Sequence, residues 1–135
     1  MFTAFLVLGA VVAAAAQTVQ VSNCNTNSVF TITDLSVDPT VPVKGQNITV
    51  HTVFNVPNDV SSGLATYKFS LNGIPFTPTV DDLCTQTACP ILSGTHDEYS
   101  SVTVPDIGGK VIVDMIWSDM TSTTTYLCLR TTLKL

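Results

Sequence analysis

Charged residues are scarce in this chain of 135 residues: they make up 11% of it, against roughly 25% in an ordinary soluble domain. Basic residues are scarcer than acidic ones, with five Lys and Arg against ten Asp and Glu, and the net charge is −5. This balance excludes a nucleic-acid binder that depends on a basic patch, and it argues against docking by charge on an anionic membrane. Disorder is also disfavoured, because 45% of the residues are hydrophobic and the charge is low.

A sustained helical periodicity is missing as well. Thr and Val supply 21 and 18 of the 135 residues, and both are β-branched, which favours strands. Apolar and polar residues alternate in several runs, as in half-buried strands. We expect strands near residues 19–21, 29–37, 48–56, 65–71, 99–104, 111–117 and 125–133, with an edge strand or extended loop at 74–80. The pattern predicts an all-β antiparallel sandwich with almost no helix.

Long apolar runs are confined to the first 16 residues. Residues 2–16 carry no charge, and Ala14-Ala15-Ala16 before Gln17 offers an A-x-A cleavage site. This run is shorter than the ~20 residues that a membrane-spanning helix needs. We therefore expect 1–16 to be a signal peptide and 17–135 to be one domain. The protein is expected to be secreted, or to lie in the lumen of a lysosome- or vacuole-like compartment.

Four cysteines remain in the predicted mature chain: Cys24, Cys84, Cys89 and Cys128. In a secreted protein they favour two disulfides, and four cysteines allow three pairings. A metal site is not expected, because only two of the cysteines are close together and neither histidine has ligand spacing. One sequon, Asn47-Ile48-Thr49, predicts glycosylation of Asn47.

Residues that could carry catalysis are few. The adjacent acids Asp81-Asp82 and Asp97-Glu98 are expected to be solvated loop residues, or to point to opposite faces of a strand. His51 falls on the polar face of its strand, and His96 is expected in a polar loop. Neither has a partner such as a G-x-S-x-G serine, and there is no glycine-rich phosphate loop. The sequence therefore predicts a binding protein without a cofactor and not an enzyme.

Local motifs give a more specific indication. Asn72-Gly73-Ile74-Pro75-Phe76 precedes a small cysteine loop that continues as Pro90-Ile91-Leu92-Ser93-Gly94, and the run 111–117 ends in Trp117, ahead of Cys128. Residues 42–47 add a Pro-x-x-Gly turn. Together these motifs resemble the ML (MD-2-related lipid-recognition) family, in the branch of the Niemann-Pick type C2 protein and the phosphatidylglycerol/phosphatidylinositol transfer proteins.

The resemblance implies an immunoglobulin-like two-sheet antiparallel β-sandwich that holds a lipid between its sheets. It also implies the pairing Cys24–Cys128 with Cys84–Cys89. By residue matching, Phe76 and Val104 fall where the family lines its pocket. The inward-facing residues of the expected strands complete the predicted lipid-binding set: Phe54, Tyr67, Phe69, Phe76, Val104, Met115 and Trp117.

Two functions are compatible with these patterns. The first is a secreted protein that binds and transfers a sterol or phospholipid, as a monomer that contacts membranes transiently and does not bind nucleic acid. The second is an immunoglobulin-like adhesion or structural domain, in which the same inward-facing residues simply fill the core.

Overall fold

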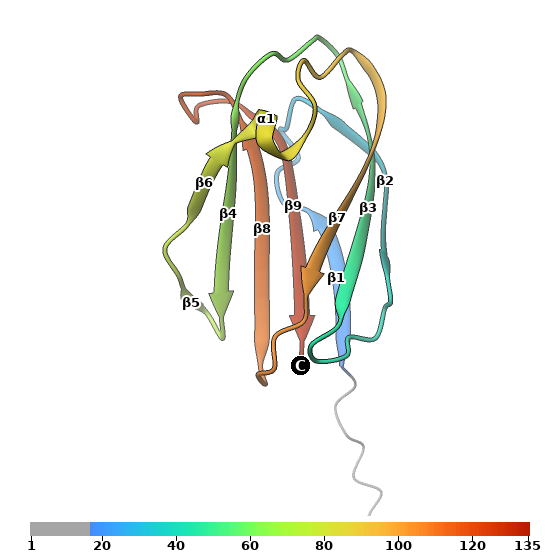
Figure 1. Ribbon diagram of the computed structural model, residues 1–135, viewed down its shortest axis with the longest axis vertical. Coiled ribbons are helices and arrows are strands. Elements are labelled where there is room, and N and C mark those ends of the chain that lie inside the picture. Colours follow the sequence, from blue (N-terminus) through green and yellow to red (C-terminus); the bar gives the residue numbers. More distant parts are fainter. Residues whose placement is uncertain (1–16) are drawn as a thin grey trace, which may run out of the picture.

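Two antiparallel sheets pack face to face in the computed structural model, which describes residues 17–135 (Figure 1). The six-stranded sheet contains β1 (Thr18–Asn23), β4 (Leu64–Leu71), β5 (Ile74–Pro75), β6 (Thr79–Asp82), β8 (Lys110–Ser118) and β9 (Thr125–Lys134). The three-stranded sheet contains β2 (Thr31–Asp38), β3 (Asn47–Val56) and β7 (Gly94–Thr103). Their spatial orders are β1-β9-β8-β4-β5, with β6 also paired to β4, and β2-β3-β7. The predicted two-sheet antiparallel β-sandwich is confirmed.

The described part of the chain contains one helix, the single turn α1 (Leu83–Gln86). Asp82 caps it, because its carboxylate accepts a hydrogen bond from the amide of Cys84 at 2.8 Å. Within residues 17–135, no helix has the length and apolarity that a membrane crossing needs. The predicted signal peptide, 1–16, lies outside the described residues.

Most strands lie where the alternation predicts them, and β7 is the exception. It begins at Gly94, five residues before the predicted start, so that His96, Asp97 and Glu98 belong to a strand and not to a loop. The prediction was wrong because this segment is polar on both faces, and a polar segment looks like a loop. Backbone pairing with all ten residues of β3 makes it a strand.

The core forms two separate clusters of buried side chains between the sheets. The upper cluster, at the α1 end in Figure 1, comprises Phe30, Phe54, Val56, Val60, Ala65, Leu83, Ile91, Trp117, Leu127 and Leu129. The lower cluster comprises Val19, Ile48, Val104, Val111 and Leu133. Strands β3, β8 and β9 contribute residues to both clusters. The middle of each of these strands therefore lies between the upper and the lower cluster.

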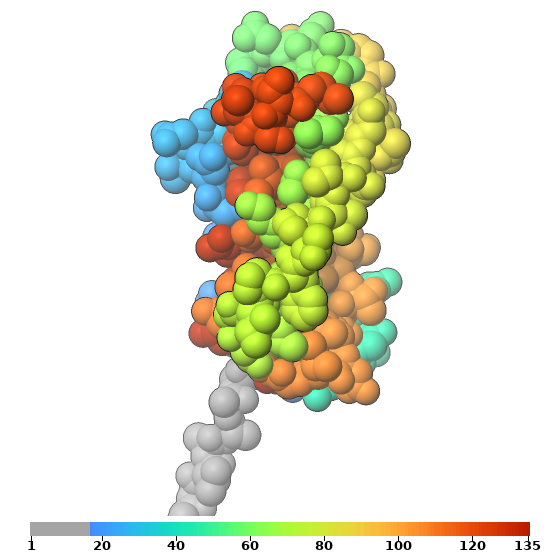
Figure 2. Space-filling view, turned by 90° about the vertical axis from the view of Figure 1, so that its left-hand side faces the viewer, coloured from blue at the N-terminus to red at the C-terminus, as the bar shows by residue number. Residues whose placement is uncertain are grey.

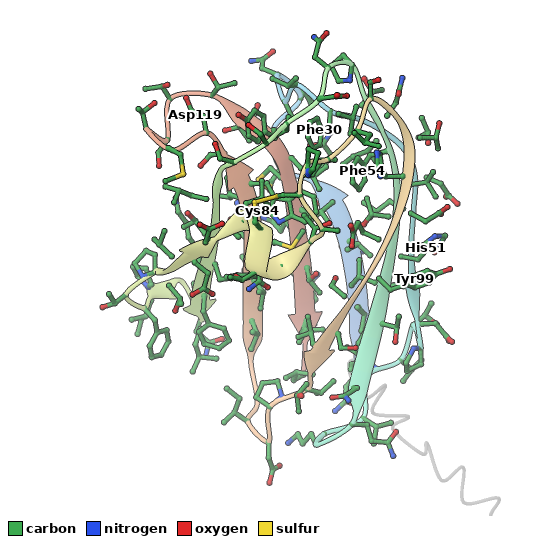
Figure 3. All side chains as sticks on the ribbon, turned by 45° about the horizontal axis from the view of Figure 1, so that its top comes forward. Phe30, His51, Phe54, Cys84, Tyr99 and Asp119 are labelled. Atoms are coloured by element: carbon green, nitrogen blue, oxygen red, sulfur yellow. A yellow bond between two sulfur atoms is a disulfide. The ribbon has the colours of Figure 1, made fainter. Side chains whose placement is uncertain are left out.

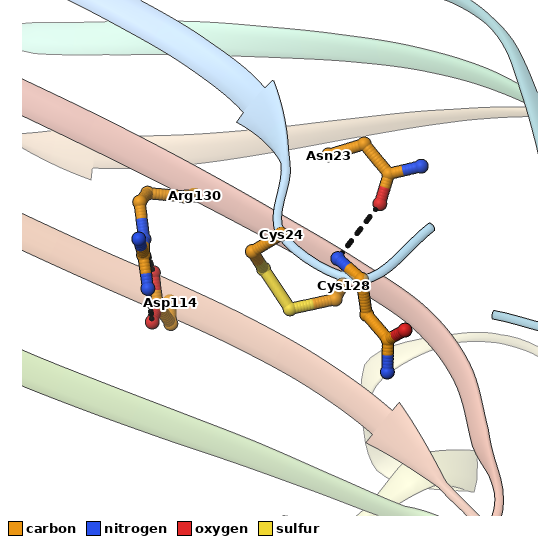
Figure 4. Close-up of polar contacts among 6 residues, drawn as sticks. Asn23, Cys24, Asp114, Cys128 and Arg130 are labelled. Atoms are coloured by element: carbon orange, nitrogen blue, oxygen red, sulfur yellow. Dashed lines mark hydrogen bonds and ion pairs between the residues drawn. A yellow bond between two sulfur atoms is a disulfide. The ribbon is translucent and has the colours of Figure 1, made fainter. Parts of the chain in front are cut away.

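One long edge of the sandwich is closed and the other is open. At the closed edge, Val19 donates a backbone hydrogen bond to Thr40 across the sheets, and Phe30 donates one to Tyr126. Cys24 and Cys128 are joined by a disulfide that fastens β9 to the chain following β1 (Figure 4). At the other edge, β7 lies across from β4 and α1, and within residues 17–135 no strand of one sheet pairs with a strand of the other there.

The second disulfide joins Cys84 to Cys89 and closes a small loop around α1. The Cα atoms are 5.1 Å apart in the first pair and 5.3 Å apart in the second, and both distances are ordinary for disulfides. These are the two pairs that the family resemblance implies.

Gly63 lies where the six-stranded sheet meets α1, and we expect Gly63→Ala to destabilise the protein by roughly 1–3 kcal/mol. A Cβ atom at this position would lie 2.5 Å from the Ser118 carbonyl oxygen and 2.8 Å from Leu83 Cδ2, so the backbone would have to move. Denaturant unfolding measures the loss. Gly108→Ala is the matched control, since a Cβ there meets nothing within 4 Å. Equal effects of the two substitutions would contradict this packing.

Candidate functional site

The inner faces of the sheets do not meet in the middle of the sandwich, and a cavity of about 380 Å³ lies there. On β8, the cavity-lining Met115 follows the lower-cluster residue Val111 and precedes the upper-cluster residue Trp117 on the same face. The cavity therefore separates the two core clusters. Its lining residues come from both sheets and α1: Thr52, Tyr67, Gln86, Glu98, Tyr99, Ser100, Ser101, Met115, Trp117, Leu127 and Leu129.

A second cavity of about 240 Å³ adjoins the first and shares five of its lining residues. It extends the space toward the lower cluster, where Val50, Val102 and Val113 add apolar walls. Small-molecule sites commonly have volumes of ~300–1,000 Å³ and mostly apolar walls. Together the two inter-sheet cavities have the size of a small-molecule site, and β8 and β9 give them apolar walls.

Strand β7 supplies a polar wall to this space. Glu98 and Ser100 lie opposite Thr52 and Val50 of β3 in register, and therefore point to the inner face. Small or polar side chains at these positions leave the sheets apart, whereas large apolar ones would fill the gap. Thr87 Oγ1 donates a hydrogen bond of 2.7 Å to Glu98 Oε1 and so connects the chain after α1 to β7.

Tyr67 projects from β4 toward the same space and carries a hydroxyl at the open edge. This hydroxyl donates a hydrogen bond of 2.8 Å to Gln86 Oε1 of α1. Burial, and secondarily the negative charge of Asp81, raises the pKa of Tyr67 above its ordinary value of 10.0. Tyr67 is therefore a neutral phenol at physiological pH, and its oxygen can still accept a hydrogen bond from a ligand.

Trp117 forms the upper end of the first cavity. Its side chain is 3% exposed, and its ring meets that of Phe54 edge-on, with centroids 5.9 Å apart. Its ring nitrogen Nε1 is buried and has no hydrogen-bond partner. Within residues 17–135 it is the one buried side-chain nitrogen or oxygen in this state. A buried donor without a partner costs about 1–3 kcal/mol, which is unusual for a residue whose only role is to fill the core.

Three of the seven predicted lipid-binding residues line the inter-sheet cavities: Tyr67, Met115 and Trp117. Phe54 does not line the cavities. It is completely buried in the upper cluster, where its ring stacks on Phe30 at 5.4 Å, and Figure 3 shows both rings inside the sandwich. Val104 is 1% exposed and belongs to the lower cluster, so it lies below the cavities.

Phe69 and Phe76 do not line the inter-sheet cavities. Phe69 packs against the lower cluster, and its ring meets that of Phe76 edge-on at 5.1 Å. Phe76 is 51% exposed, and Phe69 and Phe76 are among the residues that line a groove of about 620 Å³ beside β4 and β5. The lipid-binding roles of all seven residues remain predictions.

Glu98, Ser100, Thr52 and Gln86 also line the first cavity and were not predicted from the sequence. For β7 the available signal was the alternation itself, because counting back from Val102 in steps of two gives Ser100, Glu98 and His96 on one face. On the N-terminal side of Val102 that face carries no large aliphatic side chain, so it does not resemble the inner face of an ordinary sandwich.

Asp97 and His51 form an ion pair on the outer face of the three-stranded sheet. Asp97 points away from Glu98, to the outer face, where it pairs with His51 Nε2 at 2.8 Å. His51 also stacks on Tyr99, with ring centroids 4.4 Å apart (Figure 3). Among residues 17–135, no three His, Cys, Asp or Glu side chains form a group that could hold a metal ion.

A two-sheet sandwich with a cavity between its sheets, apolar on one side and polar on the other, has the form of a small-molecule-binding domain. The chain belongs to the ML domain family, whose sequence model matches residues 18–135. The family resemblance seen in the motifs is therefore confirmed.

Two relatives from Dictyostelium discoideum are named as phosphatidylglycerol/phosphatidylinositol transfer proteins. One is 30% identical over 89 residues, which are 63% of this chain and 63% of the relative. The other is 31% identical over 88 residues, 62% of each chain. The match thus spans less than two thirds of either relative's length.

Solved structures of the same fold include a Niemann-Pick type C2 protein from the Japanese carpenter ant and chicken MD-1 complexed with lipid IVa. The first superimposes with a TM-score of 0.61 over 82% of this chain and 95% of the other. The second gives 0.64 over 90% and 92%. Both are 13% identical to this chain, so the likeness shows the shared fold.

Proposed function

We propose that this protein is a lipid-binding and transfer protein that holds an apolar lipid tail between its two sheets. The observation that carries the proposal is the pair of adjoining inter-sheet cavities, with apolar walls from Met115 and Trp117 of β8 and Leu127 and Leu129 of β9. Each methylene that moves from water into such a space contributes roughly 0.8 kcal/mol. The names of the two relatives support the same function.

The proposed mechanism is physical and not catalytic. A lipid leaves a bilayer through the open edge between β7 and β4, its tail enters the cavities, and its head group remains near Tyr67, Gln86 and Glu98. No covalent bond forms or breaks, and no cofactor takes part. The filled-core alternative, an adhesion or structural domain, would be expected to bring the two inner faces into contact along the whole length of the strands.

Transient contact with a membrane is part of this proposal. The β5–β6 segment crosses one side of the molecule as a raised band (Figure 2). It carries three large apolar side chains that are more than half exposed: Ile74 at 67%, Phe76 at 51% and Val80 at 55%. Because β6 continues directly into α1, which contributes Gln86 to the cavity lining, these side chains support a contact close to the open edge.

We further propose that the protein is secreted, or resides in the lumen of a lysosome- or vacuole-like compartment, and that it acts as a monomer. The two disulfides support an oxidising compartment. Asn47 is exposed at the start of β3, which leaves room for a glycan on its side chain.

Met115→Asp tests the proposed site, and we expect it to lower lipid transfer by about tenfold or more. A carboxylate at this position would face the tail without a partner, which disfavours binding strongly. Transfer of a fluorescent lipid between donor and acceptor vesicles measures the effect. Ile116→Asp is the matched control, since it places the same charge one residue away on the outer face. If both variants transfer lipid at the wild-type rate, the inter-sheet site is wrong.

A further inference from the structure

The walls of the inter-sheet cavities carry negative charge and no positive charge within residues 17–135. Glu98 is the only charged side chain among the residues that line them. All five cations of the chain lie elsewhere. Lys68 and Arg130 border the groove on the outer face of the six-stranded sheet, and the other three are Lys44, Lys110 and Lys134.

Arg130 is not available to the cavity, because it is engaged on the outer face. Its Nε and Nη2 atoms donate to the two carboxylate oxygens of Asp114 at 2.8 and 2.9 Å (Figure 4). A phosphate or carboxylate head group in the cavities would therefore find no cation on their walls. Phosphate sites in proteins generally use Arg, Lys or groups of backbone amides.

The wall that β7 and β3 give to the cavities is suited to the hydroxyl groups of a ligand. A carboxylate only accepts hydrogen bonds, and Thr87 occupies Oε1 of Glu98 and leaves Oε2 for another donor. Ser100 follows Glu98 on the inner face of β7, and Thr52 lies opposite Glu98 on β3. Each hydroxyl can both donate and accept. A ligand hydroxyl that donates to Glu98 would form a charge-assisted bond, which is stronger than one between neutral groups.

We infer that the cavities select a lipid with a neutral, hydroxyl-bearing head group and discriminate against lipids with an anionic phosphate. This inference rests on the proposed function, since it specifies which lipid enters the same site. It differs from the ligands in the names of the Dictyostelium relatives, which are anionic phospholipids. Glu98 determines the difference, because a phosphate at hydrogen-bonding distance from it is repelled.

Two probes that differ only by one phosphate test the inference. They are a monoacylglycerol with a dibrominated acyl chain and the corresponding lysophosphatidic acid. Bromine quenches tryptophan fluorescence at short range, and Trp117 is the single tryptophan of the chain and lines the cavity. Titration of the purified protein with each probe at neutral pH, below its aggregation concentration, gives two dissociation constants.

We expect wild type to bind the monoacylglycerol about tenfold or more tightly than the phosphate probe. Glu98→Gln removes the charge and keeps the shape, and it should reduce this ratio by about tenfold, mainly through tighter binding of the phosphate probe. Asp97→Asn is the matched control. It removes the same charge from the next residue on the outer face, so the ratio should stay at its wild-type value.

If wild type binds the phosphate probe as tightly as the monoacylglycerol, or if Glu98→Gln and Asp97→Asn change the ratio equally, the inference about the head group is overturned while lipid binding stands. If neither probe quenches Trp117 in any variant, the proposed inter-sheet lipid site is itself overturned, and the inference fails with it.

Discussion

Replacing Cys24 and Cys128 together by alanine is expected to lower the free energy of unfolding by about 4–5 kcal/mol. The two residues are 104 positions apart, and cross-linking such a long loop removes much conformational freedom from the unfolded chain. The bond also joins β9 to the segment after β1, at the closed edge of the sandwich. Equilibrium unfolding in denaturant, without reductant, measures the loss.

The second disulfide is the control for this prediction. Cys84 and Cys89 are five positions apart, and the same chain-entropy relation gives about 2 kcal/mol for their removal. The two double variants should therefore differ clearly. A loss for the Cys84/Cys89 variant equal to or greater than that for the Cys24/Cys128 variant would show that loop closure does not explain the stability of this fold.

Phe54→Ala should cost about 3–5 kcal/mol. The Phe54 side chain is fully buried, and its ring contacts those of Phe30, His96 and Trp117, with centroid distances of 5.4, 5.7 and 5.9 Å. Its removal would leave a hole in the upper cluster and would also take away the neighbour of the cavity-lining Trp117. Thermal or denaturant unfolding measures the change.

Phe76→Ala provides the comparison, because Phe76 is 51% exposed and packs mainly against Phe69. We expect its stability cost to stay below about 1 kcal/mol. If Phe76→Ala destabilises the protein as much as Phe54→Ala does, Phe76 is a core residue and not a solvent-exposed one. If Phe54→Ala leaves stability unchanged, the upper cluster does not stabilise the fold.

The sequence predicts the fold well where one strand face is apolar and the other polar. In β3, Ile48, Val50, Phe54 and Val56 are buried as the alternation requires. The edge position of residues 74–80 also follows from their prolines, and β5 and β6 pair with the same edge of β4. Where both faces are polar, as in the first half of β7, the pattern contains no such signal.

The site is predicted less completely than the fold, for a physical reason. An inward-facing apolar residue looks the same in sequence whether it packs against the other sheet, as Phe54 does, or faces a cavity, as Met115 does. The difference depends on what lies opposite in space. Here the decisive feature is the polar inner face of β7, which includes Glu98 and Ser100, and alternation analysis gives little weight to polar residues.

Organic-solvent extraction of the purified protein, followed by lipid mass spectrometry, shows whether the sandwich holds a lipid. We expect close to one lipid per protein molecule, with a neutral hydroxyl-bearing head group, and a marked loss of that lipid from Met115→Asp but not from Ile116→Asp. A wild-type protein that is folded, free of lipid, and unable to take up lipid from vesicles would show that the protein does not bind lipid between its sheets.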